Sequence, residues 1–203
     1  MPEPHQSPTR RDMIAAALAA VGGASVATFA DASAAIQTGD STMAAQPAPT
    51  GDIHDFDYHI GSWTMVNRRL KKRWVANPEW DEFPGTDRYV KYLGGLVNVD
   101  EAVFPTKGFS GLTVRVFDLG RRQWSIYWIN SKGGALDAPM IGGFQGNLGV
   151  FYGDDIDDGR PVRARYLRMK QPPDNDRWEQ AFSLDGGLTW ETNWVADFTR
   201  LNA

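Results

Sequence analysis

The sequence predicts an all-β domain: an antiparallel up-and-down meander of about ten strands closed into a barrel. Helical periodicity is almost absent after residue 53, and short segments of alternating polar and apolar residues follow one another instead. Turn residues, mainly Gly, Asp and Pro, separate these segments at hairpin spacing. Connections this short pair each strand with the next one, and closure of the sheet removes its exposed edges. We therefore expect a barrel rather than a sandwich.

The alternation and the turn residues also predict where the strands lie. Asp157-Asp158-Gly159 and Asp185-Gly186-Gly187 are examples of the turns that divide them. The expected strands cover residues 62–74, 86–93, 96–104, 110–118, 123–130, 139–144, 147–153, 161–170, 176–184 and 188–199.

The chain is expected to have three parts. Arg10 and Arg11 precede an apolar, Ala- and Gly-rich run that ends in small residues, which predicts a twin-arginine export signal over residues 1–35 and a periplasmic or secreted protein. The run is shorter than the ~20 residues that a membrane-spanning helix needs, which argues against an anchor. Residues 36–52 are rich in Ala, Pro and Thr and predict a flexible linker, so the barrel domain should cover residues 53–203.

Composition excludes several classes of function. The absence of Cys excludes disulfides, thiolate metal sites and a Cys nucleophile. A formal net charge of −4 favours neither nucleic acid nor an anionic membrane as a partner. No nucleotide-binding fingerprint or catalytic-triad order is present. His54 and His59 could present one face to an ion, but a polar lead-in to the first strand explains them better, so we expect neither a metal nor a cofactor. The export route suggests a haem carrier, and the scarcity of His opposes it.

Residues 183–190, SLDGGLTW, resemble the Asp-box of sialidases and other β-proteins, in which the Asp caps a turn. The resemblance implies a structural role for Asp185. A three-residue loop at 185–187 would place Trp178 opposite Trp194 and Phe182 opposite Trp190, on one bulky face that should point inward. The opposite face should then carry the carboxylates towards solvent: Glu179, Glu191 and Asp197.

Eight Trp, all after residue 60, suit a barrel that encloses a ligand cavity. We expect the protein, as a monomer or a homodimer, to bind a small apolar or aromatic molecule in that cavity. The expected ligand-binding residues are Trp128, Asn130, Tyr152, Tyr166, Trp178, Trp190 and Trp194.

Glu101 suggests an alternative function. It is the one charge on a strand face that otherwise carries Val97, Val99 and Val103, so it would enter the cavity if that face points inward. It would be a surface residue if the face of Asn98 and Asp100 is the inner one. In the first case the protein could be a cofactor-independent isomerase, cyclase or lyase, with Glu101 as acid or base. An arginine would then neutralise Glu101 or stabilise an oxyanion, and the catalytic candidate is Arg115, with Arg69 and Arg165 as further choices.

Residues 56–63 (FDYHIGSW), 93–101 (LGGLVNVDE), 124–128 (WSIYW) and 178–182 (WEQAF) resemble an uncharacterised bacterial lipocalin-like, calycin-type β-barrel family of unknown function. The likeness covers nearly all of residues 53–200 and implies a fold but no activity. The Gly61-x-Trp63 opening is similar to the first strand of calycin barrels. This implies that Trp63 packs across the barrel base, with Arg200 as its stacking partner.

Overall fold

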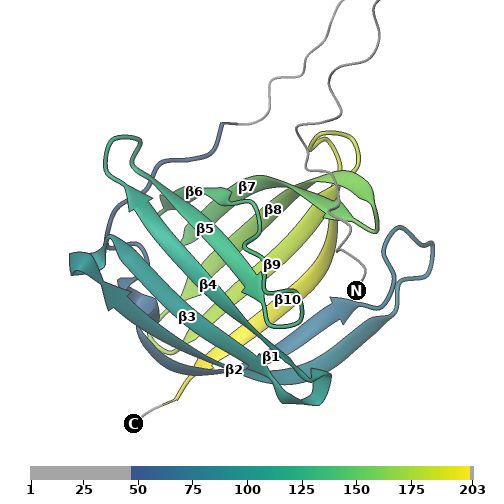
Figure 1. Cartoon of the computed structure of the whole chain (residues 1–203), viewed down its shortest axis with the longest axis horizontal. Coiled ribbons are helices and arrows are strands. Elements are labelled where there is room, and N and C mark those ends of the chain that lie inside the picture. Colours follow the sequence, from purple (N-terminus) through teal and green to yellow (C-terminus); the bar gives the residue numbers. More distant parts are fainter. Residues whose placement is uncertain (1–46, 202–203) are drawn as a thin grey trace, which may run out of the picture. The chain divides into compact units, whose positions relative to one another are not determined.

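The computed structural model describes residues 47–201, which form a closed antiparallel barrel (Figure 1). The predicted export signal, residues 1–35, lies outside the described residues. Between residues 47 and 201 the barrel has ten strands: β1 (Gly61–Leu70), β2 (Trp80–Tyr92), β3 (Val97–Phe104), β4 (Phe109–Asp118), β5 (Gln123–Asn130), β6 (Met140–Gln145), β7 (Leu148–Asp157), β8 (Arg160–Gln171), β9 (Asn175–Ser183) and β10 (Glu191–Arg200). Three short 3-10 helices accompany them: η1 (Asp57–His59), η2 (Leu93–Gly95) and η3 (Pro105–Lys107). In this part of the chain no helix has the length and apolar character needed to cross a membrane.

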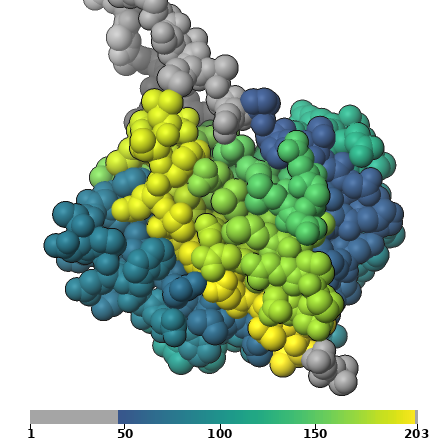
Figure 2. Space-filling model, turned by 180° about the vertical axis from the view of Figure 1, so that it is seen from behind, coloured from purple at the N-terminus to yellow at the C-terminus, as the bar shows by residue number. Residues whose placement is uncertain are grey.

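The strands follow one another around the wall as a meander, which confirms the predicted fold class. Each strand pairs with its neighbour in sequence, and β1 also pairs with β10, from Trp63 opposite Arg200 to Arg69 opposite Trp194. Figure 2 shows this closure on the outer surface, where yellow β10 crosses between the blue start of the barrel and the green strands that precede it.

Four strand boundaries differ from the prediction by three residues or more, and one of them is the end of the seventh strand, at Asp157 instead of residue 153. The first strand ends at Leu70 instead of residue 74, and the chain bends over residues 71–74, where Trp74 has a φ of 62°. The second begins at Trp80 instead of residue 86, since Pro84 stands within the strand, opposite Val66, and does not mark a turn. The tenth begins at Glu191, because the Asp-box loop extends past residue 188.

The alternating strand directions give the barrel two distinct ends. Helix η1 and the connections at 93–96, 119–122, 146–147 and 172–174 lie at one end, which we call the base. The other end, which we call the distal end, carries the connections at 71–79, 105–108, 131–139, 158–159 and 184–190.

The described part of the predicted linker is held against the base. Gln123 donates a hydrogen bond to the carbonyl of Ala48 at 2.7 Å, the Gly51 N–H donates to the carbonyl of Arg122 at 2.7 Å, and the Trp124 indole donates to the carbonyl of Asp52 at 3.1 Å. Residues 48–52 are therefore hydrogen-bonded to the barrel.

Trp63 closes the base as the calycin likeness implied. Its side chain is fully buried, and its indole N–H donates to the carbonyl of His59 at 2.8 Å. The Arg200 guanidinium lies 4.2 Å from the Trp63 ring centroid and donates to the carbonyls of Ile60, at 2.8 Å, and Tyr58. The predicted stacking of Arg200 on Trp63 is confirmed, and the same arginine ties η1 to the end of β10.

The Asp-box has the structural role that its likeness implied. The Asp185 carboxylate accepts hydrogen bonds from the hydroxyls of Ser183 and Thr189, both at 2.6 Å, and from the N–H groups of Leu188 and Thr189, at 3.0 and 2.9 Å. These bonds, led by the one from Ser183, hold the pKa of Asp185 well below its usual range.

The predicted register of this hairpin is wrong. Phe182 pairs with Glu191, not with Trp190, and Trp178 pairs with Ala196, not with Trp194, because the register shifts between Thr192 and Trp194.

The three carboxylates of this hairpin have different surroundings. Glu179 and Asp197 form ion pairs with Arg177 on the outer wall, at 2.7 and 2.8 Å, whereas Glu191 accepts hydrogen bonds from the Trp74 N–H at the distal end.

Candidate functional site

The barrel encloses a cavity of about 310 Å³. Its wall carries aromatic rings from four strands: Trp128 from β5, Tyr166 from β8, Trp178 from β9 and Trp194 from β10. The ring centroids of Tyr166 and Trp178 lie 5.2 Å apart and those of Trp178 and Trp194 5.5 Å apart, both pairs edge to face. Five of the seven expected ligand-binding residues therefore line the cavity: Trp128, Asn130, Tyr166, Trp178 and Trp194.

Gly111 allows the Trp128 ring to lie where it does. The residue is on the inner face of β4, and a Cβ built on it would come within 2.0 Å of two carbons of the Trp128 ring. Any other residue at this position would push the indole away, so this glycine shapes the cavity wall.

Tyr152 and Trp190 do not line the cavity, contrary to expectation. Tyr152 points outward because the inner face of β7 belongs to Phe151 and its alternate neighbours. Trp190 belongs to the connection before β10 and packs on the outside, 6.0 Å from the Tyr152 ring, with the Arg165 guanidinium 4.6 Å from its own ring centroid.

Glu101 is exposed, so the second of the two alternatives is correct: it is a surface residue and does not enter the cavity. The inner face of β3 carries Asn98 and Asp100, which are 1% and 2% exposed, and the three valines share the outer wall with Glu101. The polar face is the inner one because the neighbouring strand supplies partners for Asp100: Arg115 forms an ion pair with it, and the Thr113 hydroxyl donates to it at 2.9 Å. Glu101 thus has no place from which to act on a molecule in the cavity.

Arg115 lines the cavity, as predicted, but its charge is already matched. Besides the ion pair with Asp100, its guanidinium lies 4.9 Å from the ring centroids of both Phe56 and Tyr89. Its role is therefore to hold the floor of the cavity together, and its partner in this role is Asp100 rather than Glu101.

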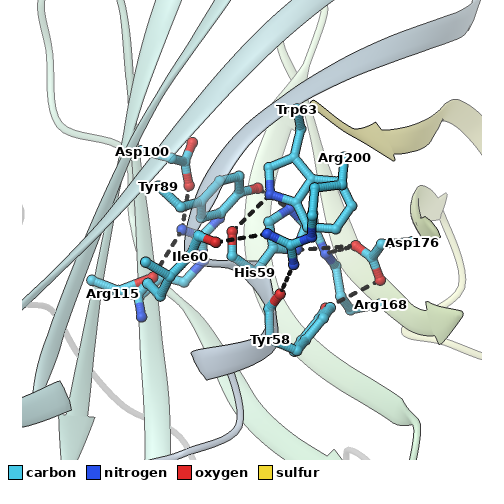
Figure 3. A network of polar contacts seen from close by, with 11 residues as sticks. Tyr58, His59, Ile60, Trp63, Tyr89, Asp100, Arg115, Arg168, Asp176 and Arg200 are labelled. Carbon is cyan, nitrogen blue, oxygen red and sulfur yellow. Dashed lines mark hydrogen bonds and ion pairs between the residues drawn. The ribbon is translucent and has the colours of Figure 1, made fainter. Parts of the chain in front are cut away.

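A second buried arginine organises the base around η1, as Figure 3 shows. Arg168 lies 2.5 Å from a carboxylate oxygen of Asp176, donates to the Tyr89 hydroxyl at 2.9 Å, and contacts the ring nitrogens of His59 at 2.7 and 2.8 Å. The Tyr58 hydroxyl donates to Asp176 at 3.1 Å. Burial, and then the charge of Arg168, hold the pKa of His59 well below its usual value, so the imidazole is neutral.

The two histidines of the domain do not converge. His59 belongs to this buried network, whereas His54 is paired with Asp57 at the surface, at 2.8 Å. Between residues 47 and 201 no group of three or more His, Asp and Glu side chains is arranged to hold a metal ion.

Asp87 is a cavity residue that the sequence analysis missed. It lies on the inner face of β2, is 5% exposed, and its Oδ1 atom has no hydrogen-bond partner among the described residues. Burial, and then the nearby charge of Asp100, raise the pKa of Asp87 well above its usual value. The predicted strand 86–93 contained Asp87, but it left out Phe83 and Gly85, which share the inner face of β2 and would have shown that this face is buried.

The distal end of the cavity is also charged. Arg73 forms an ion pair with Asp157, and the Trp74 indole donates to the same carboxylate at 2.8 Å. These contacts tie the connection at 71–79 to the end of β7. Arg69, on β1, enters the cavity beside them.

No protein-family model matches the chain, and no curated protein is significantly similar to it. The cavity and its chemistry are therefore the basis for inferring a function.

Proposed function

We propose that the barrel binds a small, largely apolar or aromatic molecule in its cavity. The observation that carries this proposal is the wall formed by Trp128, Tyr166, Trp178 and Trp194 around a space of about 310 Å³. Small-molecule sites are typically concave and mostly apolar, with a few polar groups that orient the ligand. Polar side chains line the cavity as well, but the charges of Arg115 and Arg168 at its floor are already matched by carboxylates.

Binding is better supported than catalysis. The enzyme alternative depended on Glu101 as acid or base, and Glu101 lies on the outer wall. Arg115, the proposed oxyanion stabiliser, is paired with Asp100. Neither residue of that mechanism is free to act inside the cavity.

We further propose that the protein binds its ligand in the periplasm after twin-arginine export, and that it belongs to the lipocalin-like family named above. The Arg10-Arg11 pair with its apolar run supports the first proposal. The closed meander and the packing of Arg200 on Trp63 support the second.

The test is a titration with N-phenyl-1-naphthylamine, an uncharged aromatic probe whose fluorescence rises in apolar surroundings. The chain offers a matched pair of variants, since Trp178 lines the cavity and Trp190 does not. We expect saturable binding by the wild type and by Trp190→Ala. For Trp178→Ala we expect the dissociation constant of the probe to rise by roughly tenfold or more, because a large apolar contact is lost.

Absence of saturable binding to the wild type would contradict the proposal, as would equal losses in the two variants. Native mass spectrometry of protein purified from the periplasm would complement the titration by identifying any molecule that co-purifies.

A further inference from the structure

Arg69 differs from the other arginines of the cavity. Four arginines line it, and three have carboxylate partners: Arg73 with Asp157, Arg115 with Asp100 and Arg168 with Asp176. Within residues 47–201, Arg69 has neither an ion pair nor a hydrogen-bond acceptor for its guanidinium. A cation withdrawn from water without a partner is costly, so its presence calls for an explanation.

The strand geometry directs Arg69 into the cavity. It lies on the same face of β1 as Trp63, Met65 and Asn67, which all point into the interior. Its Cζ atom lies 4.5 Å from the ring centroid of Trp194. One face of the guanidinium therefore stacks on the aromatic wall, and its N–H edge remains available.

The Trp194 ring on which Arg69 stacks is held in place by its own contacts. The Trp194 indole N–H donates to Oδ1 of Asn67 at 3.1 Å, and Trp178 packs against the same indole edge to face. Phe83 and Phe104 also contact the Trp194 ring, so Arg69 rests on a ring whose position is fixed by one hydrogen bond and three ring contacts.

Four acids on β2, on β7 or in the cavity lining do not bond Arg69: Asp137 and Asp155 line the cavity without an ion pair to it, and the other two are engaged by other cations. Asp81 stands opposite Arg69 on β2, but its carboxylate is engaged by Lys107. Asp157 accepts from Arg73 and from the Trp74 indole. Burial, and then the charge of Arg73, lower the pKa of Arg69, but a guanidinium titrates so high that it stays charged at neutral pH.

We infer that Arg69 receives the carboxylate of the ligand, which is then an aromatic or aliphatic monocarboxylic acid. The inference rests on the proposed function and names its ligand class. A guanidinium edge presents parallel N–H donors that match a carboxylate in a two-bond arrangement. The apolar body of the acid lies against Trp178 and Trp194, below its carboxylate, so one molecule satisfies both the unpaired cation and the aromatic wall.

The test compares two probes of nearly the same shape by isothermal titration calorimetry: 1-naphthylacetate and its uncharged amide, 1-naphthylacetamide. The chain supplies an unusually close control, because Arg68 is the neighbouring residue but pairs with Asp197 on the outer wall. Arg69→Gln and Arg68→Gln remove the same charge from the same strand, one inside the cavity and one outside it.

We expect the wild type and Arg68→Gln to have an affinity for the carboxylate that is about tenfold higher, or more, than their affinity for the amide, as a charge-assisted hydrogen bond predicts. Arg69→Gln should bind both probes with the affinity that the wild type has for the amide. Arg69→Lys should recover part of the preference, because it keeps the charge but not the two-bond geometry.

Two outcomes would overturn the inference. Equal binding of both probes by the wild type, or a preference retained in Arg69→Gln, would leave the barrel a binder of neutral molecules, and the proposed function would stand without this ligand class. Binding of neither probe by any variant would count against the inference and the proposed function together.

Discussion

Replacement of Arg200 by Ala should destabilise the barrel strongly, although the residue lies at the end of the last strand. The side chain donates to the carbonyls of Ile60 and Tyr58 and stacks on Trp63, with 4.2 Å between the guanidinium carbon and the ring centroid. It therefore joins β10 to the segment that closes the base.

The contacts of Arg200 allow the decrease in the free energy of unfolding to be estimated. Hydrogen bonds to a charged group contribute about 1.5–3 kcal/mol each, and a partly exposed cation–π contact contributes about 0.5–1 kcal/mol. The Arg200 side chain is 24% exposed, so water will rehydrate part of what Ala leaves behind. We expect the free energy of unfolding to fall by about 2–4 kcal/mol, which in a domain of this size lowers Tm by on the order of 10 °C.

The assay is urea unfolding followed by tryptophan fluorescence, with circular dichroism to verify the β-fold of each variant. Arg88→Ala is the control, because Arg88 is exposed on β2 and has no hydrogen bond or ion pair with any described residue. It should change stability by less than about 0.5 kcal/mol. Arg200→Lys should fall between the two, since an ammonium group cannot reproduce the fork of a guanidinium. If Arg200→Ala unfolds at the same urea concentration as Arg88→Ala, the clamp at the base is not a source of stability and the reasoning fails.

Three further predictions concern the cavity and the hairpin. Burial raises the pKa of Asp87 in the folded state, so its contribution to stability is fully present below about pH 4 and is lost as the pH rises through the folded-state value. Asp87→Asn should therefore gain stability relative to the wild type as the pH increases in urea titrations from pH 4 to 8, and a constant difference would disprove this. Gly111→Ala places a Cβ within 2.0 Å of the Trp128 ring and should cost about 1–3 kcal/mol and weaken probe binding, whereas Gly133→Ala, with no atom within 4 Å, should do neither. Asp185→Ala should lower Tm by removing the acceptor that caps the Asp-box turn, with unchanged affinity for the probe; altered affinity at full stability would instead implicate the turn in binding.

Several features of the molecule could be predicted because their causes are local. The closed meander follows from short turns between alternating segments, and the Asp-box turn follows from residues that hydrogen-bond within 183–190. The stacking of Arg200 on Trp63 came from a likeness at the start of the first strand rather than from the pattern of the residues. Trp178 and Trp194 fell on the inner face even though the register between them was wrong, because a shift of two positions preserves the face.

The candidate site was predicted less well because its residues depend on partners from other strands. Alternation shows that Asn98 and Asp100 share one face of β3 and Glu101 the other, but it does not show which face is inside. A valine face is normally buried, and here it is not, because Arg115 and Thr113 on β4 compensate the burial of Asp100.

The sequence by itself determined the class of the fold, most of its strands and the residues that share each strand face, because backbone alternation and turn chemistry act over a few residues. Only the tertiary structure decided which face the barrel encloses and which charges remain unmatched inside it. Arg68 and Arg69 illustrate the difference: they are identical neighbours in sequence, yet one pairs with Asp197 on the outer wall and the other lies unpaired against Trp194. Whether a buried charge finds a partner depends on side chains that arrive from distant strands.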